Sequence, residues 1–147
     1  MENDYKIEKA STSLHYFEII ALRKSVFVEE QGIPPHLEMD GKDDESVFSI
    51  ATDEDNHVIA AGRLTIVDQN EGVVSRIVVR NDHRGKGIAR KIVDHLEAQA
   101  KQKEITLLTL KPHDYLHDFY ASLGYKKYGE AEYVGKHALF NMEKIIQ

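Results

Sequence analysis

The apolar positions in the first third of the chain predict a short strand followed by an amphipathic helix. The strand is expected around residues 5–8, and the STS tripeptide at 11–13 supplies N-cap candidates for the helix. The helical pattern continues through LRKSVFVEEQ, with or without a break, until Gly32 and the Pro34-Pro35 pair end it. An irregular acidic loop is expected to about residue 45. Four apolar side chains share the predicted helical face: Leu14, Phe17, Ile20 and Ala21.

Alternating apolar residues in the middle of the chain predict three antiparallel strands. Those at 47–52 and 58–67 flank the polar turn DEDNH and form a hairpin, and the third covers 73–80. Strict alternation divides the third strand into two faces, because successive side chains of a strand point to opposite sides. One face holds Val73, Ser75, Ile77 and Val79, and the other holds Val74, Arg76, Val78 and Arg80.

The last third of the chain predicts two helices and two strands. GIARKIVDHLEAQAK carries a single apolar stripe, and ITLLTL is a short strand of the kind buried on both faces. A short helix from about 113 to 123 ends at Gly124, and KHALFNMEKI closes the chain as a strand. The order of elements predicts an α/β (α+β) fold with one mixed, mostly antiparallel central sheet flanked by helices. The stripe comprises Ile88, Ile92, Val93, Leu96 and Ala100.

Composition narrows the class of protein. The 147 residues contain no repeat or linker, which predicts a single domain over 1–147. The absence of cysteine excludes thiol nucleophiles, cysteine zinc sites and disulfides. No apolar run is long enough to cross a bilayer, and MENDYKIEKA lacks the apolar stretch of a signal peptide. We therefore expect a cytoplasmic protein without a membrane partner.

The distribution of charge says more than its sum. One alternative function is a nucleic-acid-binding module that uses the basic residues of 76–91. A net charge of −6 disfavours it, because such domains need a basic excess. Residues 38–55 hold eight carboxylates and one lysine, whereas 76–91 hold six basic residues and one aspartate. This asymmetry predicts an anionic ligand near 76–91 and a cationic one near 38–55. The alternative is that both stretches are solvated surface.

The segment RGKGIA stands between a predicted strand and a predicted helix, where glycines and helix N–H groups suit a phosphate. It fits neither the Walker A loop nor the GxGxxG pattern. It resembles the signature Arg/Gln-x-x-Gly-x-Gly/Ala of the GNAT acetyltransferases, which binds the pyrophosphate of acetyl-CoA. FYASLGY at 119–125 is similar to a later motif of that family. LRKSVFVEEQGIP with a following Glu-x-Asp resembles the small bacterial ElaA-like subgroup. The segment comprises Arg84, Gly85, Lys86, Gly87, Ile88 and Ala89.

The resemblance covers nearly the whole chain and implies an N-acetyltransferase of the GNAT fold with acetyl-CoA as co-substrate. It implies that residues 84–89 bind the pyrophosphate, and that the backbone of Ile77, Val78 and Val79 pairs with the pantetheine amides. A backbone N–H near Val79 would face the thioester oxygen. Tyr120 stands where the family places the acid that protonates the leaving thiolate, while Phe119 is expected to fill the core.

The residues around the acceptor are less defined. Glu30, Glu38 and Asp40 are candidates for binding the substrate ammonium or accepting its proton, and they could instead cap helices. Arg23 could pair with one of them, which would make it structural. The resemblance implies that residues 26–45 overhang the acetyl end of the co-substrate, and because this segment is rich in carboxylates, the expected acceptor is a small cationic primary amine. The sequence leaves a homodimer open.

Two further alternatives remain at this point. His113 and His117 have a spacing that could bind zinc, but HDYLHD has Asp where the metalloprotease motif has Glu and lacks a third ligand, so no metal is predicted. His137 could line the acceptor pocket. Ser75 and Lys111 replace the Glu and Asn of many relatives, which motivates a catalytically silent acyl-CoA-binding regulatory domain as the alternative to an enzyme.

Overall fold

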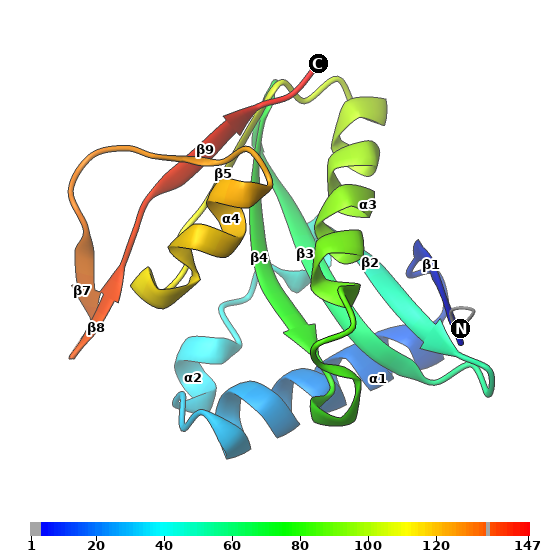
Figure 1. The fold of residues 1–147 in the computed structure, drawn as a ribbon. Coiled ribbons are helices and arrows are strands. Elements are labelled where there is room, and N and C mark those ends of the chain that lie inside the picture. The colour runs from blue at the N-terminus through cyan, green and yellow to red at the C-terminus, as the bar shows by residue number, and fades with distance from the viewer. Residues whose placement is uncertain (1–3, 135) are drawn as a thin grey trace.

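The computed structural model describes residues 4–134 and 136–147, and in them seven strands form one sheet in the order β1-β2-β3-β4-β5-β9-β6 (Figure 1). β7 and β8 form a separate hairpin. The strands are β1 Tyr5–Lys9, β2 Ser46–Asp53, β3 Val58–Asp68, β4 Glu71–Val79, β5 Leu107–Leu110, β6 Lys126–Lys127, β7 Glu132–Val134, β8 His137–Leu139 and β9 Met142–Ile145. The α-helices are α1 Ser13–Arg23, α2 Pro35–Glu38, α3 Ile88–Gln102 and α4 His117–Ser122. The predicted mixed, mostly antiparallel sheet is confirmed.

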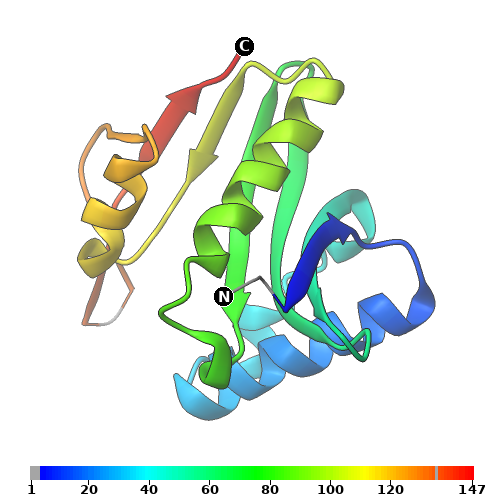
Figure 2. The same cartoon turned by 45° about the vertical axis from the view of Figure 1, so that its right-hand side comes forward.

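Helix α3 covers one face of the sheet, as Figure 2 shows. All five predicted stripe residues are buried, and they form one core with side chains of β3, β4 and β5. The helix approaches β3 closely at Gly62, where an added Cβ would lie 2.6 Å from Ile92 Cγ2. Glycine is therefore required at position 62 by helix-to-sheet packing.

The predicted apolar face of α1 is wrong. Thr12 caps the helix by accepting a hydrogen bond from the His15 N–H at 3.0 Å, but Leu14 and Phe17 are 59% and 70% exposed. The helix instead buries Ile19, Leu22 and Arg23 against the other face of the sheet, and a π-helical turn over Lys24–Glu30 continues it. Apolar side chains occur on both sides of α1, so periodicity alone does not select the buried one.

A β-bulge reverses the two predicted faces of β4 partway along the strand. Pairing with β3 shifts between Ala61 and Arg63, and Arg76 has a left-handed φ of 55°. The extra residue moves Ile77 and Val79 to the face that packs on the α3 core, together with Val74. Val78 joins the core beneath α1. The predicted alternation therefore fails at Arg76, because a bulge inserts one residue without changing the sequence pattern.

Three other expectations need correction. The acidic loop contains α2, which begins at Pro35 because proline suits the first helical turn, and a 3₁₀ turn over Asp43–Glu45. The helix predicted from 113 begins later: a 3₁₀ turn over Asp114–Leu116 precedes α4. The final strand is split into β8 and β9, since the Phe140 N–H leaves the ladder to donate to the Pro112 carbonyl.

β4 and β5 pair in parallel over only three residues each, Glu71–Val73 with Leu107–Thr109. Beyond Val73 the two strands diverge, and Figure 1 shows the gap opening toward α2, with α4 beside β5. The bulge at Arg76 lies within this diverging part of β4. The fold therefore leaves an edge of β4 without a neighbouring strand at the place where the predicted site residues lie.

Candidate active site

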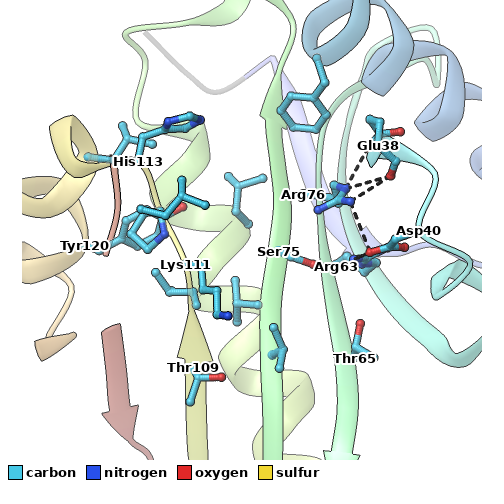
Figure 3. A pocket seen from close by; sticks show the side chains of 18 of the residues that line it. Glu38, Asp40, Arg63, Thr65, Ser75, Arg76, Thr109, Lys111, His113 and Tyr120 are labelled. Atoms are coloured by element: carbon cyan, nitrogen blue, oxygen red, sulfur yellow. Dashed lines mark hydrogen bonds and ion pairs between the residues drawn. The ribbon is translucent and has the colours of Figure 1, made fainter. Parts of the chain in front are cut away.

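A cleft of about 630 Å³ occupies the gap between β4 and β5. Ser75 and Arg76 line it from β4, Lys111 lies just past the end of β5, Tyr120 comes from α4 and Glu38 from α2 (Figure 3). Residues separated by up to 82 positions in sequence thus meet around one space. A cleft of this size fits a small ligand together with the reactive end of a larger one.

The predicted phosphate loop has the backbone geometry that an anion site requires. Gly85 and Gly87 both have left-handed φ angles, 79° and 78°, which glycine adopts without strain. Gly87 is the N-cap of α3, and no side chain caps the helix there, so its first N–H groups lack an acceptor among the described residues. Ile88 points its side chain into the core, which leaves only its backbone for a ligand. Phosphate oxygens fit this arrangement.

The open edge of β4 can pair with an extended ligand. The Arg80 N–H donates to the Ile59 carbonyl of β3, so the preceding N–H and carbonyl, those of Val79, point to the opposite edge. The Arg84 Nε donates to that carbonyl at 3.0 Å, which agrees with this orientation. The Val79 N–H thus faces the gap into which the cleft opens. The backbone groups of Ile77 and Val79 therefore fit the predicted pantetheine amides, whereas those of Val78, which the sequence also predicted, point toward β3 instead.

Tyr120 is the one predicted catalytic residue, and its ring is 6% exposed. The ring makes edge contacts with Phe119, at a centroid distance of 4.9 Å, and with Tyr125, at 6.0 Å. Its hydroxyl has no hydrogen-bond partner among residues 4–134 and 136–147, although the residue lines the cleft. Burial raises the pKa of Tyr120 to about 12, so the hydroxyl carries its proton at neutral pH. Phe119 is half-buried against the core, as predicted.

Glu38 is buried and held by two arginines. Arg23, itself fully buried at the end of α1, donates through Nε to Glu38 Oε2 at 2.9 Å and through Nη2 to Oε1 at 3.1 Å. The Arg76 Nε also donates to Oε2 at 2.9 Å. The expectation that Arg23 pairs with one of the acidic candidates is confirmed, and the pair fixes α2 to the end of α1.

Asp40 and Asp43 extend the ion-pair network around Glu38 through Arg23 and Arg63. Arg63 donates through Nη1 and Nη2 to both oxygens of Asp40, at 2.9 and 2.8 Å, and the pKa of Asp40 lies well below its usual range because of these bonds. The Asp43 Oδ1 accepts from Arg23 and Arg63 at 2.8 and 2.9 Å. We call this set the charge cluster; it comprises Arg23, Glu38, Asp40, Asp43, Arg63 and Arg76.

The charge cluster removes the electrostatic reason for expecting a cationic acceptor. Glu38 and Asp40 line the cleft, as a substrate-binding role requires, but neither carboxylate is free. Glu30 lies apart from them: it binds Arg84 of the phosphate loop through two hydrogen bonds, at 2.7 and 3.1 Å. The part of the acidic stretch that borders the cleft is therefore neutralised by arginines, while Asp44, Glu45, Glu54 and Asp55 are exposed outside the cleft lining.

Sequence reasoning missed Arg63 and Arg76 as partners of the acidic stretch. Arg63 stands alone in the apolar run VIAAGRLTIV, and a single charge in a buried strand needs a partner. That signal was available in the sequence. Arg76 gave no such signal, because its orientation depends on the bulge.

His113 and His117 do not lie on one helix, as the alternative of a zinc-binding pair requires. His113 precedes the helical turns and contacts the rings of Tyr115 and His137, while His117 faces Asp118 and Phe140. His137 thus lies behind His113, which itself lines the cleft. Within the described ranges no group of three or more His, Asp or Glu side chains could hold a metal.

No described helix has the length and apolar character that a membrane span requires.

Comparison with known proteins identifies the family. The model of the acetyltransferase (GNAT) family matches residues 15–125. The uncharacterized N-acetyltransferase YjcF of Bacillus subtilis is 31% identical over 113 residues, which cover 77% of this chain and 79% of that protein.

Solved structures share the whole fold. The crystal structure of Escherichia coli ElaA has a TM-score of 0.84 at 18% identity and covers 95% of this chain and 99% of its own. An aminoglycoside 6'-N-acetyltransferase complexed with coenzyme A has a TM-score of 0.79 at 14% identity, with 95% and 96% covered. These likenesses confirm the predicted fold, and the family model covers most of the sequence. The chain belongs to the acetyltransferase (GNAT) family.

Proposed function

We propose that this enzyme transfers the acetyl group of acetyl-CoA directly onto a primary amine of a small acceptor bound in the cleft between β4 and β5. GNAT acetyltransferases use acetyl-CoA. The uncapped start of α3 and the open edge of β4 supply donors for its pyrophosphate and its pantetheine amides. The observation that carries the proposal is Tyr120, a buried residue that lines this cleft and whose hydroxyl has no hydrogen-bond partner in the described part of the chain.

Direct attack forms a bond between the amine nitrogen and the carbonyl carbon and breaks the carbon–sulfur bond. The Val79 N–H, which faces the gap, donates to the carbonyl oxygen as negative charge develops there. The Tyr120 hydroxyl protonates the departing thiolate. Its raised pKa of about 12 keeps it protonated at neutral pH, so it can donate the proton when the carbon–sulfur bond breaks. The proton that the nitrogen loses passes to water, and the Tyr120 phenolate regains a proton from water. The products are the acetamide and the free thiol.

Binding of acetyl-CoA is expected to stabilise the fold, because the loop donors gain acceptors. At a hundredfold excess over the dissociation constant the gain should be about 2.7 kcal/mol, measured as a rise in melting temperature. Gly87→Asp should abolish the rise, since it places a carboxylate where phosphate binds. Nothing lies within 4 Å of a Cβ at Gly87, so the substitution adds only the strain of a left-handed φ at an exposed loop residue, and the core should remain folded, which circular dichroism can check.

Gly129→Asp is the matched control, since Gly129 also has a left-handed φ and open space around a Cβ but lies in the loop before β7. Its melting temperature should still rise with acetyl-CoA. An unchanged melting temperature of the unmodified protein at millimolar acetyl-CoA would contradict the proposal. The release of free thiol with a panel of amines tests the reaction itself. A rise without amine-dependent thiol release would favour the silent acyl-CoA-binding domain that Ser75 and Lys111 suggest.

Glu30→Gln separates two roles of this carboxylate. Glu30 pairs with Arg84 at the phosphate loop, so its removal is expected to free Arg84 and lower the KM for acetyl-CoA by about threefold, as fits an exposed ion pair. The acceptor's KM should stay the same. Steady-state kinetics with each substrate varied checks this, with Glu29→Gln, at the neighbouring exposed carboxylate, as the control. A raised acceptor KM would instead support the substrate-binding role predicted from the sequence.

A further inference from the structure

The carboxylates of the cleft are all engaged by arginines. Both oxygens of Glu38 accept from Arg23, and both oxygens of Asp40 accept from Arg63. The charge cluster contains three arginines and three carboxylates, so it is neutral as a whole. An ammonium group entering the cleft therefore meets no unpaired carboxylate among the described residues that line it. Binding a cation there would require breaking buried charge pairs, which is costly.

Two lysines, Lys42 and Lys111, line the cleft without belonging to the charge cluster. Lys42 is exposed and has no ion-pair partner within residues 4–134 and 136–147. Lys111 lines the cleft from the β5 side, where Figure 3 shows it on the same side as Tyr120 and across from Arg76. Its Nζ lies 3.1 Å from Glu132 Oε2, and the side chains of Lys111 and Glu132 are 58% and 50% exposed. A pair of this kind contributes little, so a ligand carboxylate can take the place of Glu132.

The remaining titratable groups of the cleft do not change this balance. His113 follows Lys111 by two positions, and its pKa is lowered by burial and by the nearby His137, so it is neutral at pH 7. Tyr120 is protonated, as described above. Apolar and aromatic side chains form much of the other lining, among them Phe27, Leu37 and Tyr115. The unassigned charge at the cleft is thus positive.

We infer that the acceptor carries a carboxylate in addition to the amine that is acetylated, as an amino acid does, and that Lys42 and Lys111 receive this carboxylate. The inference rests on the proposed function and specifies its acceptor. A carboxylate accepts charge-assisted hydrogen bonds from ammonium groups, the kind of contact that the cleft offers and that a polyamine cannot use. The acceptor expected here therefore carries a negative group beside its amine, unlike the purely cationic amine that the acidic stretch suggested.

Matched pairs of acceptors test the inference. Lysine and cadaverine, phenylalanine and phenethylamine, and 4-aminobutyrate and propylamine are three pairs in which the second member is the first without its carboxylate. The carboxylate-bearing member of the preferred pair is expected to have a kcat/KM about tenfold higher, and the advantage should shrink as salt is added. A best acceptor without a carboxylate, in these pairs or in a wider amine panel, would overturn the inference while leaving the acetyltransferase activity established.

Absence of thiol release with every amine would be a different result: the proposed function would fail and the inference with it. The melting-temperature rise with acetyl-CoA is measured alongside, so that loss of the cofactor site and loss of the acceptor site are distinguished.

Lysine variants then test the assigned residues. Lys111→Gln and Lys42→Gln should each lower kcat/KM for the carboxylate-bearing acceptor by about tenfold through KM, and leave its carboxylate-free counterpart and the KM for acetyl-CoA unchanged. Lys111→Arg should retain most of the preference. Lys103→Gln, at the far end of α3 and outside the cleft, is the control. Equal losses for both members of a pair would show that these lysines do not read the carboxylate and would overturn their assignment.

Discussion

Replacing Tyr120 by Phe is expected to lower turnover on the order of 10²-fold, the usual contribution of a general acid, while the affinity for acetyl-CoA changes little. Only the hydroxyl is lost. The ring keeps its edge contacts with Phe119 and Tyr125, so α4 and the wall of the cleft should stay in place. The measurement is the rate of thiol release at saturating acetyl-CoA and acceptor, together with the dissociation constant for acetyl-CoA.

Tyr125→Phe is the matched control for this substitution. The Tyr125 hydroxyl donates to Glu97 Oε2 at 2.9 Å inside the core, away from the cleft lining. Its removal should therefore lower the free energy of unfolding and leave turnover nearly unchanged. If Tyr120→Phe kept the full rate, water would be the proton donor to the thiolate, and Tyr120 would serve only to pack the short helix α4.

The sequence predicts those parts of the fold in which the local pattern of apolar residues is compatible with only one buried face. α3 carries a single apolar stripe, so its buried face follows from helical periodicity. α1 carries apolar side chains on both sides, and the sheet beneath it decides that Ile19 is buried while Phe17 is exposed. The bulge in β4 is still less accessible, because it depends on the register with β3 and leaves no local signature at Arg76.

The same distinction applies to the site. The phosphate loop is contiguous, so its glycines and the helix behind it can be recognised from the sequence. The charge cluster joins α1, α2, β3 and β4 through contacts between residues up to 38 positions apart, and the number of carboxylates alone does not reveal which of them are neutralised. The acidic stretch therefore suggested a cationic acceptor, whereas the structure pairs Glu38, Asp40 and Asp43 with arginines from other elements.

Arg23→Met should cost about 3 kcal/mol of folding free energy, near the lower end of the range for breaking a buried ion pair. Methionine preserves the length and apolar contacts of the side chain but leaves Glu38 without two of its donors inside the fold. The loss falls short of the upper end because Arg76 still donates to Glu38 and Arg63 still donates to Asp43. Urea unfolding without acetyl-CoA measures the difference.

Two further variants make this expectation specific to burial. Arg84→Met removes a guanidinium that also binds a carboxylate in two places, but that pair is exposed, so stability should change little. In Arg23→Met/Glu38→Gln the unpaired negative charge is removed, and part of the lost stability should return. A loss in Arg23→Met no larger than in Arg84→Met would contradict the role of the charge cluster. Because Glu38 ends α2 and faces the cleft, loosening its anchor should also raise the acceptor's KM, whereas the KM for acetyl-CoA, set by the loop before α3, should remain.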